Sequence, residues 1–97
     1  MNELFSIEGK IAVISGAAGV LGGTLARHFA SQGANVVALV HKEEQVVPVL
    51  ETMKSIGGDP ACFACNVMDV EAMKAIAVSV LDRYGRIDAL LNIAGGQ

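Results

Sequence analysis

Short apolar runs alternate along the chain with longer stretches in which apolar residues recur at helical spacing. Continuous apolar runs at 10–15, 35–40 and 61–65 are typical of strands that are buried on both faces of a sheet. A fourth run, 88–95, ends in glycine and predicts a strand that leads into a turn. The pattern therefore predicts four strands with a helix between each consecutive pair.

Helices are expected at 19–32, at about 44–56 and at 70–84. Pro48 is tolerated only in the first turn of a helix, so the second helix either begins late or kinks there. Asp69 is suited to cap the third helix. The residues expected to face the sheet are Leu21, Leu25 and Phe29 in the first helix, Val46, Val49, Leu50 and Met53 in the second, and Met73, Ile76, Ala77, Val80, Leu81 and Tyr84 in the third.

This alternation of strands and helices indicates an α/β protein with a parallel sheet and right-handed crossovers. A chain of 97 residues is enough for one small domain. The first strand is expected to have neighbours on both sides, which gives the strand order 3-2-1-4 and leaves the fourth strand as an apolar edge. Such an edge favours aggregation unless something covers it, so we expect a Rossmann-like half-fold, part of a larger domain or a fragment that pairs with another chain.

Charge and composition exclude several classes of function. The formal net charge of -3 and the scattered basic residues argue against nucleic-acid binding. No stretch approaches the roughly 18 consecutive apolar residues of a membrane span. The first ten residues contain Glu3 and Glu8 and do not resemble a secretory signal. We therefore expect a cytoplasmic protein that contacts neither membrane nor nucleic acid.

Cys62 and Cys65 form a "CFAC" sequence that allows two interpretations. Redox pairs with this spacing lie at a helix start, where the thiol pKa is lowered. Here the pair lies in a predicted strand, where residues three apart face opposite sides. We therefore expect two small apolar side chains in a strand rather than a redox pair. Two cysteines without a nearby histidine also cannot complete a zinc site.

The segment "VISGAAGVLGG" carries the strongest chemical signal in the sequence. It places Gly16, Gly19 and Gly22 three residues apart, directly after a strand and at the start of a helix. Glycines at these positions allow a tight turn, a close approach of a pyrophosphate to the helix N-terminus, and close packing of helix on sheet. The alternative is a tight strand–helix turn that binds no ligand. The context within a βαβ unit favours dinucleotide binding.

Three segments together resemble the short-chain dehydrogenases/reductases: "FSIEGKIAVISGAAGVLGG", "CNVMD" and "GRIDALLNIAGG". They occur in the family's order and spacing and cover essentially the whole chain. The resemblance implies that Ser15 replaces the usual Thr and that Asn66 replaces an Asp that contacts the adenine amino group. The cofactor-binding residues that it implies are Gly16, Gly19, Val20, Leu21, Gly22, Val40, His41, Lys42, Asn66, Val67, Asn92, Ala94 and Gly95.

The sequence departs from the common family pattern at the middle glycine. The usual Gly-xxx-Gly-x-Gly spacing would put a glycine where Val20 stands, whereas Gly19 precedes it here. This form also occurs in the extended, epimerase-like branch and in some short-chain sugar-acid oxidoreductases. The "GVLGG" and "AGG" runs look similar to those of the sugar-acid (mannonate-type) group, while "NIAG" favours the reductase branch.

A second departure concerns the end of the second strand. An acidic residue about 20 residues beyond the glycines holds the ribose hydroxyls of NAD. Val40 occupies that position and is followed by His41 and Lys42. These residues slightly favour NADP over NAD, because a cationic group suits the 2′-phosphate. In the alternative interpretation they form a solvated turn, and Glu43 or Glu44 reaches back to the ribose.

The resemblance places catalysis on a Ser and a Tyr-xxx-Lys motif that follow these segments and are absent from this chain. Asp88 stands four residues after Tyr84, so Tyr84 does not fit that motif. We therefore expect the cofactor-binding portion of an oxidoreductase that acts on a hydroxyl/carbonyl pair of a small molecule, in a homo-oligomer, with this chain inactive alone. The alternatives are a non-catalytic nucleotide-binding or assembly module and another doubly wound nucleotide binder such as a methyltransferase. Val40 argues against the last, which needs an acidic residue there.

Overall fold

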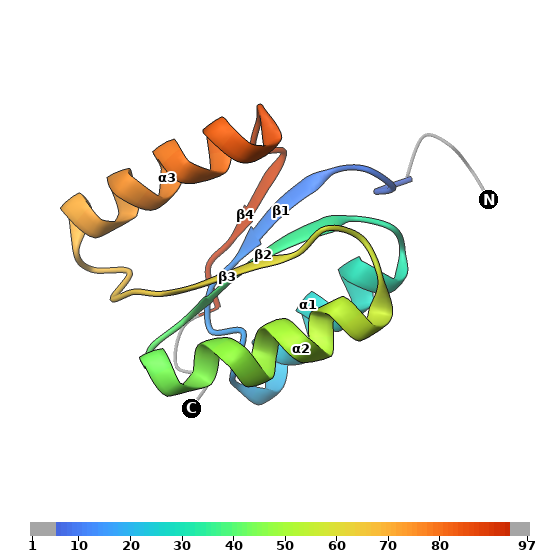
Figure 1. Cartoon of the computed structure of the whole chain (residues 1–97), viewed down its shortest axis with the longest axis horizontal. Helices are drawn as coiled ribbons and strands as arrows, with labels where there is room; N and C mark the ends of the chain where they lie inside the picture. Colours follow the sequence, from blue (N-terminus) through green and yellow to red (C-terminus); the bar gives the residue numbers. More distant parts are fainter. Residues whose placement is uncertain (1–5, 94–97) are drawn as a thin grey trace.

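The computed structural model describes residues 6–93, and one parallel sheet forms the centre of the molecule (Figure 1). The strands are β1 (Ile11–Ile14), β2 (Asn35–Val40), β3 (Ala61–Ala64) and β4 (Ala89–Leu91). They pair in the order β3-β2-β1-β4, and every pair is parallel. The predicted α/β class and strand order are confirmed.

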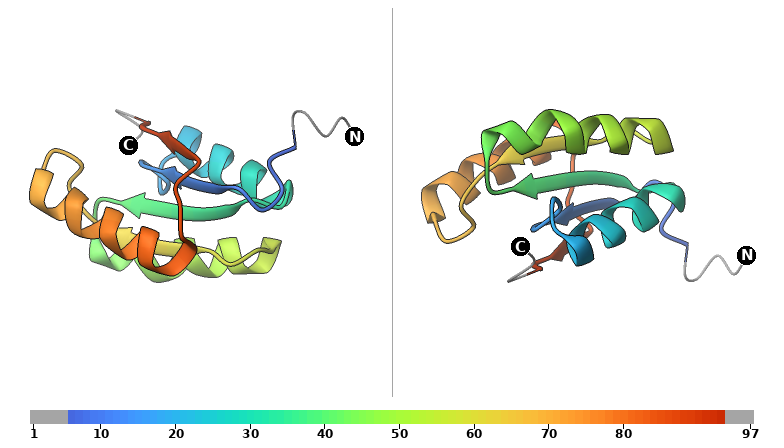
Figure 2. Two further views of the ribbon diagram at one scale, coloured as in Figure 1. Left: turned by 90° about the horizontal axis from the view of Figure 1, so that it is seen from above. Right: turned by 90° about the horizontal axis from the view of Figure 1, so that it is seen from below.

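The helices are α1 (Val20–Ser31), α2 (Val46–Ile56) and α3 (Val70–Tyr84), with a short 3-10 helix, η2 (Glu43–Gln45), before α2. Pro48 lies in the first turn of α2, where its missing N–H removes no helical hydrogen bond. The second helix therefore begins late rather than kinking. Helices α1 and α2 cover one face of the sheet and α3 lies on the other, as the two views of Figure 2 show.

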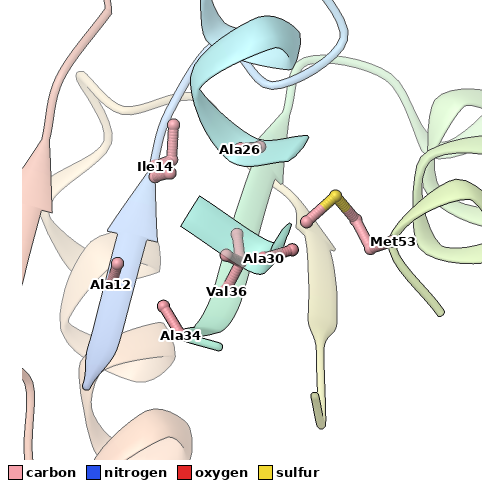
Figure 3. Packing of buried hydrophobic residues seen from close by; sticks show 7 residues of the cluster. All are labelled: Ala12, Ile14, Ala26, Ala30, Ala34, Val36 and Met53. Atoms are coloured by element: carbon pink, nitrogen blue, oxygen red, sulfur yellow. The ribbon is translucent and has the colours of Figure 1, made fainter. Parts of the chain in front are cut away.

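Helix α1 contacts the sheet through its smallest residues, which corrects the expected stripe of larger ones. Gly22, Gly23, Ala26 and Ala30 are buried, whereas the side chain of Leu21 is 58% exposed. The cluster beneath α1 consists mainly of alanine, valine and isoleucine, with Met53 reaching in from α2 (Figure 3). Small side chains bring the helix close to the strands, so the bulkier leucine is displaced to the outside.

Helix α3 covers the other face mainly through Val80, which is buried against β1, β2 and β3. Met73, Ile76 and Tyr84 pack partly against the same cluster. The predicted position of Leu81 is wrong, because its side chain is 48% exposed. Consecutive helical residues differ by about 100° in direction, so a helix that points Val80 at the sheet turns Leu81 aside.

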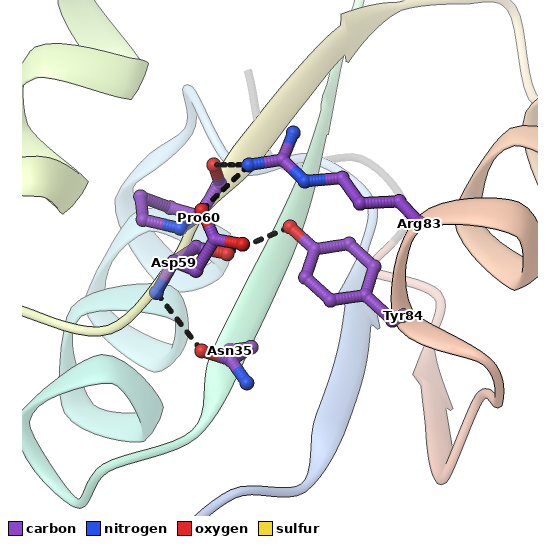
Figure 4. Close-up of polar contacts among 5 residues, drawn as sticks. All are labelled: Asn35, Asp59, Pro60, Arg83 and Tyr84. Carbon is purple, nitrogen blue, oxygen red and sulfur yellow. Dashed lines mark hydrogen bonds and ion pairs between the residues drawn. The ribbon is translucent and has the colours of Figure 1, made fainter.

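Polar contacts fasten the end of α3 to the connection before β3 (Figure 4). The guanidinium of Arg83 pairs with the carboxylate of Asp59 at 2.6 Å, and the hydroxyl of Tyr84 donates to the Asp59 carbonyl at 2.7 Å. The Asp59 N–H donates to the side-chain oxygen of Asn35 at 2.9 Å. Because these side chains are largely exposed, they position the loop more than they stabilise the fold.

Asp88 connects the start of β1 to the segment before β4. Its Oδ2 atom accepts a hydrogen bond from the Ile11 N–H at 2.8 Å and another from Arg86 Nε at 3.0 Å. The backbone hydrogen bond is the main cause of a lowered pKa for the Asp88 carboxyl, and the nearby cations Arg86 and Lys10 add to it. The ionised carboxylate therefore stabilises the folded chain.

This contact predicts a pH dependence of stability. A folded-state pKa below the ordinary 3.8 gives a contribution that is present above pH 3.8 and is lost as the pH falls through the lowered value. We expect Asp88→Asn to reduce the free energy of unfolding at neutral pH and to converge with the parent chain as the pH falls below 3.8 and through the lowered pKa. Urea titrations across that range measure the difference. Asp82→Asn, on the exposed side of α3, is the matched control, and a difference independent of pH would contradict the prediction.

Candidate functional site

A cleft of about 800 Å³ lies where the carboxyl ends of the strands meet. Parallel strands gather their carboxyl ends at one edge of a sheet, and ligands of open α/β sheets bind outside that edge. The cleft is lined by Ser15, Gly16, Ala18, Gly19, Leu39, Val40, His41, Lys42, Gln45, Cys65, Asn66, Val67, Met68, Asn92 and Ile93. Residues that follow all four strands therefore contribute to one site.

The glycine turn between β1 and α1 has no room for side chains at two positions. Gly16 has φ +65°, and a Cβ there would lie 2.6 Å from the carbonyl oxygen of Ile93. A Cβ on Gly22 would overlap the carbonyl group of Gly16. The glycines thus let the first turn of α1 rest directly on the backbone that leaves β1, as their spacing predicted.

The N-terminus of α1 is suited to hold an anion at this turn. Gly19 is the extended N-cap residue, and the first turn carries no acidic side chain. The N–H groups of Val20, Leu21 and Gly22 have no partner within the helix, and the helix dipole adds partial positive charge. Together they offer the donors that a phosphate group requires.

Ser15 fixes the end of β4 beside the turn. Its buried hydroxyl donates to the Oδ1 atom of Asn92 at 2.8 Å and accepts from the Ile93 N–H at 2.8 Å. The Ser15 N–H also donates to the Leu91 carbonyl at 2.9 Å. One hydroxyl thereby holds two consecutive residues of the cleft wall, Asn92 and Ile93. Ser15, which stands where the family usually has Thr, thus positions the end of β4.

The end of β2 presents basic rather than acidic side chains. Val40 is only 2% exposed and packs with Ala17 and Ala38, so its side chain offers no polar group to the cleft. His41 and Lys42 follow it and are exposed. The Lys42 N–H donates to Gln45 Oε1 at 3.0 Å, and the Gln45 N–H returns a bond to the Lys42 carbonyl at 2.9 Å. These bonds hold the turn in one shape.

Neither acidic residue of η2 belongs to the cleft lining. Glu44 lines an adjoining groove between α1 and α2, which shares Ala18, Gly19 and Gln45 with the cleft, and Glu43 lines neither cavity. The interpretation in which one of them reaches the ribose therefore has no support from this arrangement.

The end of β3 forms the wall of the cleft farthest from β4. The Oδ1 atom of Asn66 accepts a hydrogen bond from the Met68 N–H at 2.9 Å, and the Asn66 carbonyl accepts from the Asp69 N–H at 2.9 Å. Asp69 in turn caps α3 by accepting from the Ala72 N–H at 3.1 Å. The turn that presents Asn66 and Val67 to the cleft is thereby fixed.

Cys62 and Cys65 are both free cysteines and lie in different surroundings. Cys62 packs against the cluster beneath α2, and burial raises the pKa of its thiol to about 11. Cys65 lines the cleft instead, with its Sγ atom 3.4 Å from Met73 Sδ, and partial burial raises its pKa also. Raised pKa values disfavour the reactive thiolate, so the apolar interpretation is supported.

Most of the predicted cofactor-binding residues come together in this cleft. Those that line it are Gly16, Gly19, Val40, His41, Lys42, Asn66, Val67 and Asn92. Gly22, Val20 and Leu21 contribute the α1 N-terminus rather than the cleft wall, and Ala94 and Gly95 lie outside the described residues. The lining residues that the sequence analysis did not name as cofactor-binding are Ser15, Ala18, Leu39, Gln45, Cys65, Met68 and Ile93. Each of them lies within three positions of a predicted residue in the sequence, and this closeness is the signal that could have identified them.

Two further observations concern the described part of the chain. Among residues 6–93, no three or more His, Cys, Asp or Glu side chains gather in a group that could hold a metal ion. No helix within those residues has the length and apolar character needed to cross a membrane.

A family model described as short chain dehydrogenase matches residues 10–97, and the chain belongs to this family. The 2,3-dihydro-2,3-dihydroxybenzoate dehydrogenase of Bacillus subtilis is 39% identical over 92% of this chain, which spans 34% of that protein. This chain thus corresponds to about a third of its relative.

Solved structures share the fold closely. The L-sorbose reductase of Gluconobacter frateurii, complexed with NADPH and L-sorbose, superposes with a TM-score of 0.86 at 30% identity, covering 93% of this chain and 35% of that one. A short chain dehydrogenase/reductase from Burkholderia phymatum in complex with NAD gives a TM-score of 0.82 at 27% identity, covering 89% and 31%. Both nicotinamide dinucleotides therefore occur among proteins with this fold.

The contact between Gly22 and Gly16 predicts a strong effect of a single methyl group. Gly22→Ala must push α1 away from the turn, and we expect a loss of about 3 kcal/mol in the free energy of unfolding. Gly23→Ala is the matched control, because this substitution brings the same gain in helix propensity. Its added Cβ would lie 3.1 Å from its nearest neighbours, so it lacks the overlap that the Gly22 substitution creates. Urea denaturation of both variants measures the difference, and equal losses would contradict the close approach.

Proposed function

We propose that this chain forms the adenosine and pyrophosphate portion of the nicotinamide-dinucleotide site in a short-chain oxidoreductase, with residues 1–97 as part of its NAD(P)-binding domain. The observation that carries the proposal is the cleft at the strand ends, into which the glycine turn leads. Family membership supports it.

Each part of the cleft has a chemical role in this proposal. The pyrophosphate lies against the N-terminus of α1 at Gly16, Gly19 and Gly22. His41 and Lys42 face the adenosine ribose, since the residue after β2 meets the ribose in this fold. On the opposite side of β1, Asn92 borders the remainder of the dinucleotide, and the resemblance assigns the same role to Ala94 and Gly95, which lie outside the described residues. The first-turn residues Val20 and Leu21 contribute their backbone N–H groups, and Asn66 and Val67 border the adenine.

The whole protein is proposed to interconvert a hydroxyl and a carbonyl group of a small molecule by hydride exchange with the dinucleotide. The resemblance assigns the proton transfer to a Ser and a Tyr-xxx-Lys motif in a part of the family domain beyond these residues. Tyr84 is not a candidate, because its hydroxyl donates to the Asp59 carbonyl at the end of the sheet away from the cleft. This chain alone therefore supplies binding without proton transfer.

A sugar-acid substrate of the mannonate type is proposed on the "GVLGG" and "AGG" runs. The similarity to a reductase complexed with L-sorbose supports a sugar-derived substrate. We also propose a cytoplasmic homo-oligomer. The exposed apolar side chains of Leu90 on β4 and Val78 on α3 support burial against further polypeptide.

NADP is proposed as the preferred dinucleotide. The absence of an acidic side chain at Val40, the exposure of Lys42, and the absence of Glu44 from the cleft lining all support this preference. A carboxylate at the end of β2 would repel a 2′-phosphate, whereas an ammonium group attracts it.

Binding measurements on the full chain test the dinucleotide preference. We expect Lys42→Gln to weaken NADPH binding by about 1 kcal/mol, or about fivefold, and to leave NADH binding unchanged, because only the 2′-phosphate meets the lost charge. Lys54→Gln, an exposed lysine near the end of α2, is the control and should change neither affinity. Isothermal titration calorimetry measures both. Equal weakening of NADPH and NADH would contradict the preference, and no binding of either would contradict the proposed function.

A further inference from the structure

A second groove, of about 340 Å³, lies between α1 and α2 beside the cleft at the strand ends. Its volume falls at the low end of the range of about 300–1,000 Å³ that is typical of small-molecule sites. The groove shares Ala18, Gly19 and Gln45 with the cleft, and most of its other lining residues come from the two helices. Among the described residues proposed to contact the dinucleotide, only Gly19 lines it. The proposed function therefore does not account for this α1–α2 groove.

Buried apolar side chains line the groove. Ala26 of α1 is 1% exposed and Met53 of α2 is 2% exposed, and both belong to the core cluster of Figure 3. Val49 also lines the groove and packs partly against the same cluster. Because burial of apolar surface stabilises a complex, these side chains favour a ligand with an apolar portion.

The groove is also lined by two exposed side chains of opposite charge, Arg27 and Glu44. Neither takes part in an ion pair within residues 6–93. Arg27 donates from Nη2 to the Thr24 hydroxyl at 3.4 Å, which leaves the other donors of its guanidinium for a ligand. A carboxylate matches these donors, and the Glu44 carboxylate can accept from an ammonium group.

Gly23 leaves room for the Arg27 guanidinium beside the groove. A Cβ on Gly23 would lie 3.1 Å from Arg27 Nη1, so the arginine side chain lies back along α1 over the preceding turn. Glycine is unfavourable inside a helix compared with alanine, and the proposed dinucleotide contacts of the glycine turn are Gly16, Gly19 and Gly22. The position of the guanidinium gives Gly23 a role that those contacts do not.

A ligand that matches this groove carries both charges itself. A simple carboxylate would pair with Arg27 and be repelled by Glu44, and a simple amine would meet the reverse, because both residues border the same small groove. An α-amino acid carries a carboxylate and an ammonium group and has no net charge. If its side chain is apolar, the side chain matches the buried surface of Ala26 and Met53.

We propose that the α1–α2 groove binds an α-amino acid with an apolar side chain. Arg27 pairs with the carboxylate of the ligand, Glu44 pairs with its ammonium group, and the ligand side chain packs on Ala26 and Met53. This site is additional to the dinucleotide cleft, and it does not require that a dinucleotide binds there.

The experiment is an NMR titration of the ¹⁵N-labelled full chain with three probes of similar shape: L-leucine, 4-methylpentanoate, which lacks the ammonium group, and isopentylamine, which lacks the carboxylate. We expect L-leucine to bind with a dissociation constant on the order of 1 mM, as suits so small a ligand. Each analogue should bind at least about fivefold more weakly, because it loses one charge pair and keeps one repulsion. The amide signals of Ala26 and Thr52, which line only the groove, should shift more than those of Asn66 and Asn92, which line only the cleft.

Two variants separate the charge pairs from a general loss of structure. Arg27→Gln should weaken L-leucine about fivefold without weakening isopentylamine, which has no carboxylate to lose. Glu44→Gln should weaken L-leucine to a similar extent without weakening 4-methylpentanoate. Lys74→Gln removes an exposed cation from α3, on the other face of the sheet, and is the control that should leave all three affinities unchanged.

Three results on the parent chain would overturn the proposal, whether or not the variants fold. They are no saturable binding of L-leucine at about ten times the expected dissociation constant, equal affinities for the three probes, and shifts that are larger at Asn66 and Asn92 than at Ala26 and Thr52. In folded variants, an equal loss of affinity for every probe would also overturn it. Calorimetry with NADPH tests the proposed function separately, so either proposal can fail without the other.

Discussion

The contact between Gly22 and the carbonyl of Gly16 is the constraint on which the site depends. Because no side chain separates them, the first turn of α1 rests on the backbone that leaves β1. The buried alanines Ala26 and Ala30 continue this close approach along the helix. The free N–H groups of α1 are therefore held at the edge of the sheet where the other strands also end. A larger residue at Gly22 would displace the anion site and the cleft together.

The sequence was sufficient to predict the architecture because its separate local signals all indicate the same order of strands and helices. Apolar runs, helical periods and terminal residues such as Asp69 and Gly85 all indicate the same βα alternation, and the parallel order follows from it. The burial of Leu21 and of Leu81 was mispredicted for different reasons: small residues bring α1 close to the strands, whereas α3 turns Leu81 aside when it points Val80 at the sheet. Periodicity identifies the apolar side of a helix, whereas the distance between helix and sheet decides which of its residues contact the core. That distance depends on the small residues, which hydrophobicity patterns underestimate.

The candidate site was predictable to the extent that it consists of strand ends. Gly16, His41 and Asn66 could be placed in one cleft because parallel strands bring their carboxyl ends together. The hydrogen-bond partners of these residues could not be predicted. The Oδ1 atom of Asn66 is engaged by Met68, and Gln45 closes the turn at Lys42, only because of local backbone conformations. These contacts depend on the local backbone conformation, and sequence spacing does not determine them.

The central position of β1 has a consequence for the order of assembly. The hydrogen bonds of Ile11 in β1 to Asp88 and of Ser15, the next residue after β1, to Asn92 each join residues 77 positions apart, whereas β2 follows β1 closely in the chain. Contacts of such long range form slowly, because a large loop must close first. During synthesis on the ribosome, β1 therefore acquires one neighbour early and keeps an open, apolar edge until β4 emerges. The strand that carries the glycine turn is thus completed only after β2 and β3 have emerged and can pair with each other.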